Sequence, residues 1–153
     1  YYSEASLILS QAKNAGLNVI FFGCDGLDGI LGMDNFDKSL AEGVMLLTPF
    51  TPTAKDERTQ NFVKNFTAKY DKTYLNQFGA DAYDAIYIIK AAIEKAGVTA
   101  DMDASTICDK LKVAMTEITF TGVTGTDITW GADGEPVKKP IAVKIVNGEY
   151  VVM

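Results

Sequence analysis

The sequence contains no histidine, one tryptophan and a single arginine, Arg58, among its 153 residues. Without histidine it lacks the commonest general base and the commonest metal ligand of proteins, so neither a zinc site nor a histidine-based active site is expected. No apolar run reaches the roughly 18 residues that a membrane-spanning helix needs. The longest stretch, Ala82 to Ile93, is interrupted by Asp84 and Lys90.

Positive charge is scarce and unclustered, and the net charge is −6. Nucleic-acid binding requires grouped Lys and Arg side chains, so no nucleic-acid partner is expected. Residues 1–50 carry six acidic and two basic side chains, which favours a cationic over an anionic ligand there. The two cysteines, Cys24 and Cys108, form no C-x-x-C motif, and the sequence leaves open whether they pair.

Helical and strand-like hydrophobic patterns alternate along the chain, which is typical of an α/β fold. Apolar spacing predicts helices over residues 3–15, 53–70, 80–96 and 103–115. Short apolar runs predict strands over residues 19–22, 44–48, 118–121, 127–130, 141–146 and 150–152. We expect the first two strands to be buried, as in a parallel sheet, and the last two to form a hairpin through Asn147-Gly148.

Local signals predict how the helices begin, end and face the core. Ser3 is a candidate N-cap for the first helix, and Thr53 with Asp56 resembles a capping box for the second. Gly16 and Gly97 are expected to end helices in the left-handed conformation. The helix over 80–96 has a broad apolar face made of Ala82, Ala85, Ile86, Ile89, Ala92 and Ile93.

The loop after the first strand, residues 23–29, is rich in Gly and Asp. Open α/β sheets bind ligands at the carboxyl ends of their strands. A phosphate loop is not favoured, because the glycines recur every third residue and do not fit G-x-G-x-x-G. An EF-hand calcium loop also fails, because counting from Asp25 puts Leu27, Gly29 and Phe36 where oxygen ligands are required.

An ammonium-binding role suits Asp25 better. A carboxylate at a strand end, flanked by glycines that let a ligand approach, can accept hydrogen bonds from a primary amine. The alternative is that Asp25 only caps the helix that follows, since Asp is a favoured N-cap residue. The loop taken alone leaves these two interpretations open.

Several segments together resemble the amino-acid-binding proteins of ABC importers, of the leucine/isoleucine/valine type with the type I periplasmic binding fold. The resemblance covers essentially the whole chain and is carried by the order and spacing of its segments. These segments are Tyr1–Glu4, Gln11–Leu17, Phe22–Gly26, Glu42–Val44, Phe62-Val63, Gly79–Ala85, Ala91–Gly97, Phe120–Gly125 and Gly131–Glu135.

The resemblance implies a three-layer, Rossmann-like lobe that is incomplete and carries C-terminal β-hairpin strands. In this family two lobes close on an amino acid, and an acidic residue of the second lobe, at the position of Asp25, binds its ammonium group. The resemblance also places Tyr1 and Phe78 at the ligand. Phe78 could equally be a hydrophobic staple of its helix. Some relatives have Glu in place of Asp25, so the ligand's identity is left open.

The family resemblance also predicts how the chain is divided. It implies that residues 1–50 and 128–153 belong to the second lobe, the latter as a β-hairpin, and that residues 53–125 form a helical segment that packs on a first lobe not included here. The start at Tyr1, with no initiator Met or signal segment, suggests a truncated chain. We therefore expect weak or no binding of amino acid by the chain alone, and self-association through uncovered apolar surface.

The function implied is non-enzymatic capture of an amino acid, branched-chain in the first instance, for an ABC permease in the membrane. The protein would act outside the cytoplasm, in the periplasm or as a cell-surface lipoprotein, and would need no cofactor or metal. The alternative is the ligand-binding domain of a receptor or sensor with the same fold. An enzyme of the Rossmann type is disfavoured, because no nucleophile–base pair can be identified.

Overall fold

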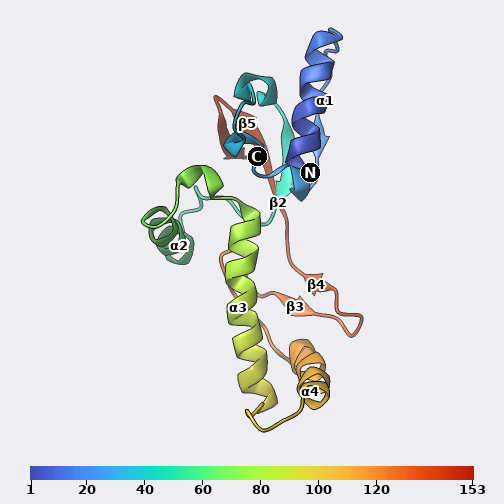
Figure 1. The fold of residues 1–153 in the computed structure, drawn as a ribbon, viewed down its shortest axis with the longest axis vertical. Coiled ribbons are helices and arrows are strands. Elements are labelled where there is room, and N and C mark those ends of the chain that lie inside the picture. The colour runs from blue at the N-terminus through green and yellow to red at the C-terminus, as the bar shows by residue number, and fades with distance from the viewer. The chain divides into compact units, whose positions relative to one another are not determined.

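The computed structural model describes all residues, 1–153, and divides them into two compact units (Figure 1). The first unit comprises residues 1–79 and 140–153, and the second comprises residues 80–139. Residues 51–79 belong to the first unit, and helix α3 (Gln77–Ala96) crosses the boundary. The assignment of segments to two lobes stays a prediction. No helix combines the length and apolar character needed to cross a membrane.

The first unit contains a four-stranded sheet in the order β1-β2-β5-β6. Its strands are β1 (Phe22–Gly23), β2 (Met45–Thr48), β5 (Ile141–Val146) and β6 (Glu149–Val152). Strand β1 pairs with β2 in parallel, and the other neighbours are antiparallel. The predicted hairpin is confirmed: Asn147 and Gly148 have φ angles of 53° and 76°, as a tight turn between β5 and β6 requires.

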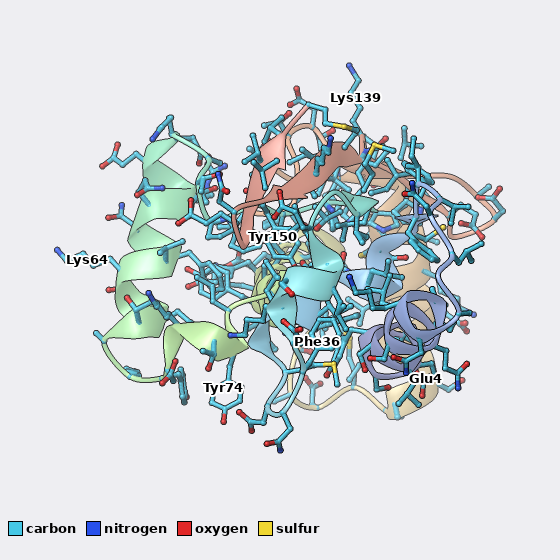
Figure 2. All side chains as sticks on the ribbon, turned by 90° about the horizontal axis from the view of Figure 1, so that it is seen from above. Glu4, Phe36, Lys64, Tyr74, Lys139 and Tyr150 are labelled. Carbon is cyan, nitrogen blue, oxygen red and sulfur yellow. The ribbon has the colours of Figure 1, made fainter.

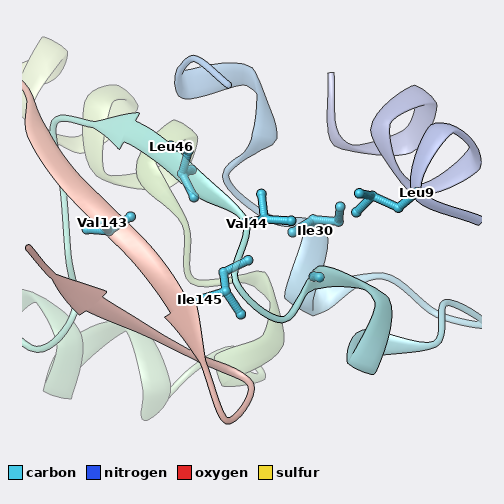
Figure 3. Close-up of a cluster of buried hydrophobic side chains, with 7 residues drawn as sticks. Leu9, Ile30, Val44, Leu46, Val143 and Ile145 are labelled. Carbon is cyan, nitrogen blue, oxygen red and sulfur yellow. The ribbon is translucent and has the colours of Figure 1, made fainter. Parts of the chain in front are cut away.

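Helix α1 (Tyr2–Asn14) and the 3₁₀ turns after β1 cover this sheet with a shared apolar core (Figure 3). Its buried members are Leu9, Ile30, Ala41, Val44, Leu46, Val143 and Ile145. Complete burial of a Leu, Ile or Val side chain stabilises a fold by about 1.5–3 kcal/mol. The mixed α/β class predicted from the sequence is therefore confirmed, and its core joins the two ends of the chain.

Two predictions near the N-terminus are wrong in detail. Helix α1 begins at Tyr2, so Ser3 lies inside it rather than at its N-cap. The run from Val19 does not form a buried strand, because β1 starts only at Phe22 and is an edge strand that pairs with β2 alone. Val19 and Ile20 are 51% and 78% exposed. The prediction for Gly16 is confirmed, since it follows the helix with φ of 67°.

Helix α2 (Glu57–Thr67) is capped by Asp56, whose side chain accepts a hydrogen bond from the Thr59 backbone N–H. The predicted capping box is therefore wrong, because Asp56 is the N-cap itself and the helix begins after it rather than after Thr53. Thr53 instead shares a hydrogen bond of 2.9 Å with the Thr51 hydroxyl. The Phe62 ring, on the inner face of α2, meets Phe50 edge-on with ring centroids 5.7 Å apart, which anchors α2 to the chain that follows β2.

The second unit contains most of α3, helix α4 (Ala104–Glu117) and a small sheet of β3 (Thr129–Trp130) and β4 (Pro136–Val137). Asp103 caps α4 by accepting from the Thr106 N–H. The predicted strand over 118–121 is reduced to one bridge between Phe120 and Ile128. Strand β4 was not predicted. Cys24 and Cys108, whose pairing the sequence left open, are both exposed and free.

Apart from Ala92, the apolar face of α3 is exposed, as expected for a helix that lacks part of its cover. Ile86, Ile89 and Ile93 are 68%, 49% and 37% exposed, whereas Asp84 is only 2% exposed. The Asp84 carboxylate accepts hydrogen bonds from the backbone N–H groups of Val123 and Thr124, at 3.0 and 2.8 Å. A helical pattern identifies an apolar face but not what covers it, and here a hydrogen-bonded carboxylate organises the covered side.

Candidate functional site

The loop after β1 folds into a single 3₁₀ turn, Asp25–Leu27. The backbone of Cys24 enters this turn in an extended conformation, and no side chain caps it. The turn is closed by a hydrogen bond of 2.9 Å from the Asp28 N–H to the Asp25 carbonyl. The alternative interpretation of Asp25 as a helix cap is therefore wrong.

The Asp25 side chain is exposed and takes part in none of the hydrogen bonds or ion pairs of the structure. Its position follows from the strand before it, because the chain leaves the sheet at Gly23 and turns at once. An exposed carboxylate without a protein partner keeps its acceptor oxygens available. Such a group can accept hydrogen bonds from the N–H groups of a cationic ligand.

Asp28, three residues further along, has the opposite surroundings. It is 4% exposed and accepts hydrogen bonds from the Gln77 N–H at 2.8 Å and the Thr48 hydroxyl at 3.4 Å. Burial raises the pKa of the Asp28 carboxyl above its usual value, although these hydrogen bonds oppose the shift. Asp28 thus joins the loop to β2 and to the first residue of α3.

Aromatic rings lie beside this loop. The Tyr1 and Phe78 ring centroids are 6.2 Å apart, and those of Tyr2 and Phe78 are 6.3 Å apart. A Cβ atom added at Gly26 would lie 3.4 Å from the Tyr1 ring, so glycine at this position lets the ring approach the backbone next to Asp25. The structure therefore brings the three predicted site residues, Asp25, Tyr1 and Phe78, into one neighbourhood of the first unit.

The staple interpretation of Phe78 does not hold, because a staple residue precedes its helix and Phe78 is the second residue of α3. Its ring is 37% exposed. Tyr1 is more exposed, at 78%. Both rings therefore retain surface that an apolar ligand side chain could cover.

Sequence reasoning missed three polar residues that organise the loop: Asp28, Gln77 and Tyr150. Gln77 is 1% exposed, and its Nε2 donates a hydrogen bond of 2.6 Å to the Asp25 carbonyl. The Tyr150 hydroxyl accepts a hydrogen bond from the Gly29 N–H at 3.3 Å. Tyr150 lies among other side chains of the first unit, whereas Lys64 extends outward from α2 (Figure 2).

The environment of Tyr150 is set by its neighbours. Burial, together with the negative charge of Asp28, raises the pKa of the Tyr150 hydroxyl far above its usual range, so it remains protonated. Nothing in the sequence indicated that residues 28, 77 and 150 would meet.

The groups at the loop can form the contacts of a small-molecule binding site. No group of three or more His, Cys, Asp or Glu side chains is arranged to hold a metal ion. The free carboxylate and the adjoining rings combine a cation acceptor with apolar walls. That combination suits a small ligand with one protonated amine and one apolar part.

Residues 2–149 match the family model for periplasmic binding proteins, and the chain belongs to that family. The predicted resemblance is thereby confirmed. Over 127 residues the chain is 32% identical to the leucine-, isoleucine-, valine-, threonine- and alanine-binding protein of Pseudomonas aeruginosa. The matched region is 83% of this chain and 32% of that protein, so the chain spans about a third of this relative's length.

Solved structures share the fold along the whole chain. A leucine-binding protein from Thermotoga maritima is 26% identical, with a TM-score of 0.78, and the match covers 100% of this chain and 41% of that one. The substrate-binding protein of a Streptococcus pneumoniae branched-chain amino acid transporter, crystallised with isoleucine, is 25% identical with a TM-score of 0.76. That match covers 100% of this chain and 43% of that one. These relatives are binding proteins rather than enzymes.

Proposed function

We propose that this chain forms one side of the ligand site of an amino-acid-binding protein that serves an ABC importer. In this proposal Asp25 accepts the ammonium group of the amino acid, and Tyr1 and Phe78 contact its side chain. The single observation that supports it most is the exposed, unpartnered side chain of Asp25 on a turn whose backbone lies next to the Tyr1 ring. Family membership and the names of the relatives support the choice of an amino acid.

The energetics favour an ammonium ligand at this position. Each hydrogen bond that involves a charged group contributes about 1.5–3 kcal/mol. A branched aliphatic side chain that covers the rings adds about 25 cal/mol for each Å² removed from water. Closure of a second lobe over the ligand would exclude water and strengthen the ion pair. A branched-chain amino acid satisfies both parts of the site.

The test is an affinity measurement in a two-lobed protein. In a hybrid, this chain replaces the matching 41% of the Thermotoga maritima leucine-binding protein, and leucine, isoleucine and valine are titrated calorimetrically. We expect Asp25→Ala to weaken binding at least tenfold. The matched control is Asp34→Ala, which removes another exposed acid of the same segment and should change affinity less than twofold. Equal effects of the two substitutions would refute the role of Asp25.

The same proposal also specifies where the protein acts and which membrane partner it serves. The protein would act outside the cytoplasm, in the periplasm or anchored to the cell surface, and would deliver its ligand to a membrane permease without catalysing a reaction. A receptor or sensor domain is the alternative. Deletion of the gene distinguishes them: loss of branched-chain amino acid uptake supports transport, whereas intact uptake with a lost response to the amino acid supports sensing.

The exposed isoleucines of α3 bear on the behaviour of the chain by itself. Ile86 and Ile89 are more than 45% exposed, which supports the expectation that this helix packs against a first lobe. Without that lobe the chain should bind leucine only weakly and should self-associate. Light scattering that finds a clean monomer, or calorimetry that finds micromolar affinity for the chain alone, would contradict this expectation.

A further inference from the structure

Gln77 makes an unusual pair of contacts with the loop that carries Asp25. Its side-chain Nε2 donates to the Asp25 carbonyl at 2.6 Å, at the start of the turn. Its backbone N–H donates to the Asp28 carboxylate at 2.8 Å, just after the turn. One residue of α3 therefore binds both ends of the Asp25–Asp28 turn, across about 50 residues of sequence.

The Gln77 side chain is costly to bury. It is 1% exposed, and its Oε1 atom has no hydrogen-bond partner. A buried polar atom without a partner destabilises a fold, and a native protein that retains one calls for a specific reason. Stability alone does not supply that reason, because an apolar side chain of similar length would avoid the unsatisfied oxygen.

The position of Gln77 in α3 supplies a reason. The next residue is Phe78, whose ring faces those of Tyr1 and Tyr2. Since consecutive helical residues share one rigid backbone, a bond from Gln77 to the Asp25 carbonyl links the backbone of the carboxylate to the backbone of the ring. The Gln77 side chain, together with the bond from the Gln77 N–H to Asp28, therefore joins the Asp25 turn to the helix that carries Phe78.

We propose that Gln77 is a positioning residue of the amino-acid site. By binding both ends of the Asp25–Asp28 turn, it fixes the separation between the Asp25 carboxylate and the Phe78 ring. That separation selects the length of the ligand side chain, so Gln77 acts on the choice between long and short aliphatic amino acids. The role in selection rests on the function proposed above, whereas the link between turn and helix can be tested without ligand.

The first test measures hydrogen exchange in the chain with Gln77→Met, which keeps the length of the side chain and removes the Nε2 donor. The matched control is Gln60→Met, because Gln60 Nε2 also donates to a backbone carbonyl, that of Ala54 at 2.6 Å. Exchange is followed at Leu27 and Asp28, whose amides close the turn, and at Ile145, whose amide is bonded within the core at 2.8 Å.

We expect Gln77→Met to accelerate exchange at Leu27 and Asp28 at least tenfold and to leave Ile145 within twofold of the wild type. Gln60→Met should change none of the three. Unchanged exchange in the turn would overturn the proposal. Equal acceleration at all three amides, or global unfolding of both Gln77→Met and Gln77→Ala, would also overturn it, because Gln77 would then serve the fold rather than the site.

The second test titrates leucine and alanine into the two-lobed hybrid, with wild-type Gln77, Gln77→Met or Gln60→Met, and follows the ring signals of Tyr1 and Phe78. We expect Gln77→Met to reduce the preference for leucine over alanine at least threefold, with no change in Gln60→Met. Equal weakening of both ligands would overturn the role in selection. If neither ligand perturbs these rings in the hybrid with wild-type Gln77 at concentrations up to solubility, the proposed function is contradicted, and the hydrogen-exchange experiment alone tests the link between the turn and α3.

Discussion

Two loops of this chain are built around buried carboxylates, and they differ in what they leave exposed. In the second unit, residues 122–124 are all buried, and Asp84 accepts three hydrogen bonds from Val123 and Thr124. In the first unit, Asp28 is likewise buried and bonded, but the turn just before it leaves Asp25 exposed and without a partner.

The difference separates a structural role from a binding role. A carboxylate that builds a loop is buried and has its oxygens occupied by nearby N–H and O–H groups. A carboxylate that serves a ligand must keep its acceptors free in the absence of that ligand. The 23–29 loop contains one buried, hydrogen-bonded carboxylate and one exposed carboxylate without a partner, three residues apart, and the proposed role of Asp25 depends on that contrast. In the 121–125 loop the contacting carboxylate is the buried Asp84.

The largest effect on stability is expected in the 121–125 loop, where Asp84 accepts three hydrogen bonds. Asp84→Ala leaves two buried backbone N–H groups and the Thr124 hydroxyl without their acceptor, and should lower the free energy of unfolding by about 3 kcal/mol or more. Asp81→Ala is the control, since this half-exposed acid pairs with Lys138 near the surface and should cost less than about 1 kcal/mol. Urea denaturation of both variants checks this. A smaller loss of unfolding free energy in Asp84→Ala than in Asp81→Ala would contradict the structural role of Asp84.

A pH dependence distinguishes Asp28 from the exposed acids. Its pKa in the folded state lies above its usual value of 3.8, so the folded protein binds a proton more readily there than the unfolded chain does. Ionised Asp28 therefore reduces stability above its folded pKa, and this penalty disappears as the pH falls toward 3.8. Relative to wild type, Asp28→Asn should become more stable as the pH rises from acid to neutral.

Denaturation of wild type, Asp28→Asn and Asp34→Asn at a series of pH values measures this dependence. The Asp34→Asn control removes an exposed acid from the same segment and should show no comparable trend. A constant difference between Asp28→Asn and wild type across the series would mean that burial of Asp28 has no electrostatic cost.

The smallest effect on stability is expected at Asp25. Because its side chain is exposed and makes no bond, Asp25→Asn should change the free energy of unfolding by less than about 0.5 kcal/mol. Thermal denaturation of the chain without ligand is sufficient. A loss above about 1 kcal/mol would place Asp25 among the structural carboxylates.

Local patterns predicted much of this fold. Strand β5, the Asn147-Gly148 hairpin, Gly16 and Gly97 depend on neighbouring residues, and all agree with the structure. Contacts between segments distant in sequence were not predicted. The meeting of Asp28, Gln77 and Tyr150 is one of these, because it joins three separate segments.

The same distinction applies to the candidate site. Asp25 was identified because a strand and a Gly-rich turn lie next to it in the sequence, and the family resemblance supplied Tyr1 and Phe78. The residues that hold these three in place were not predicted, because polar contacts between distant segments leave no periodic signal. Gln77 precedes Phe78 directly and still gave no indication that its side chain returns to the Asp25 carbonyl.

The most direct test of the central claim compares leucine with 4-methylpentanoate, which lacks only the amine, in the two-lobed hybrid. Binding of each compound is measured by calorimetry to the hybrid with Asp25 and to its Asp25→Asn variant. We expect Asp25→Asn to weaken leucine at least tenfold and to leave 4-methylpentanoate unchanged or slightly tighter. An equal loss for both compounds would show that Asp25 does not bind the ammonium group.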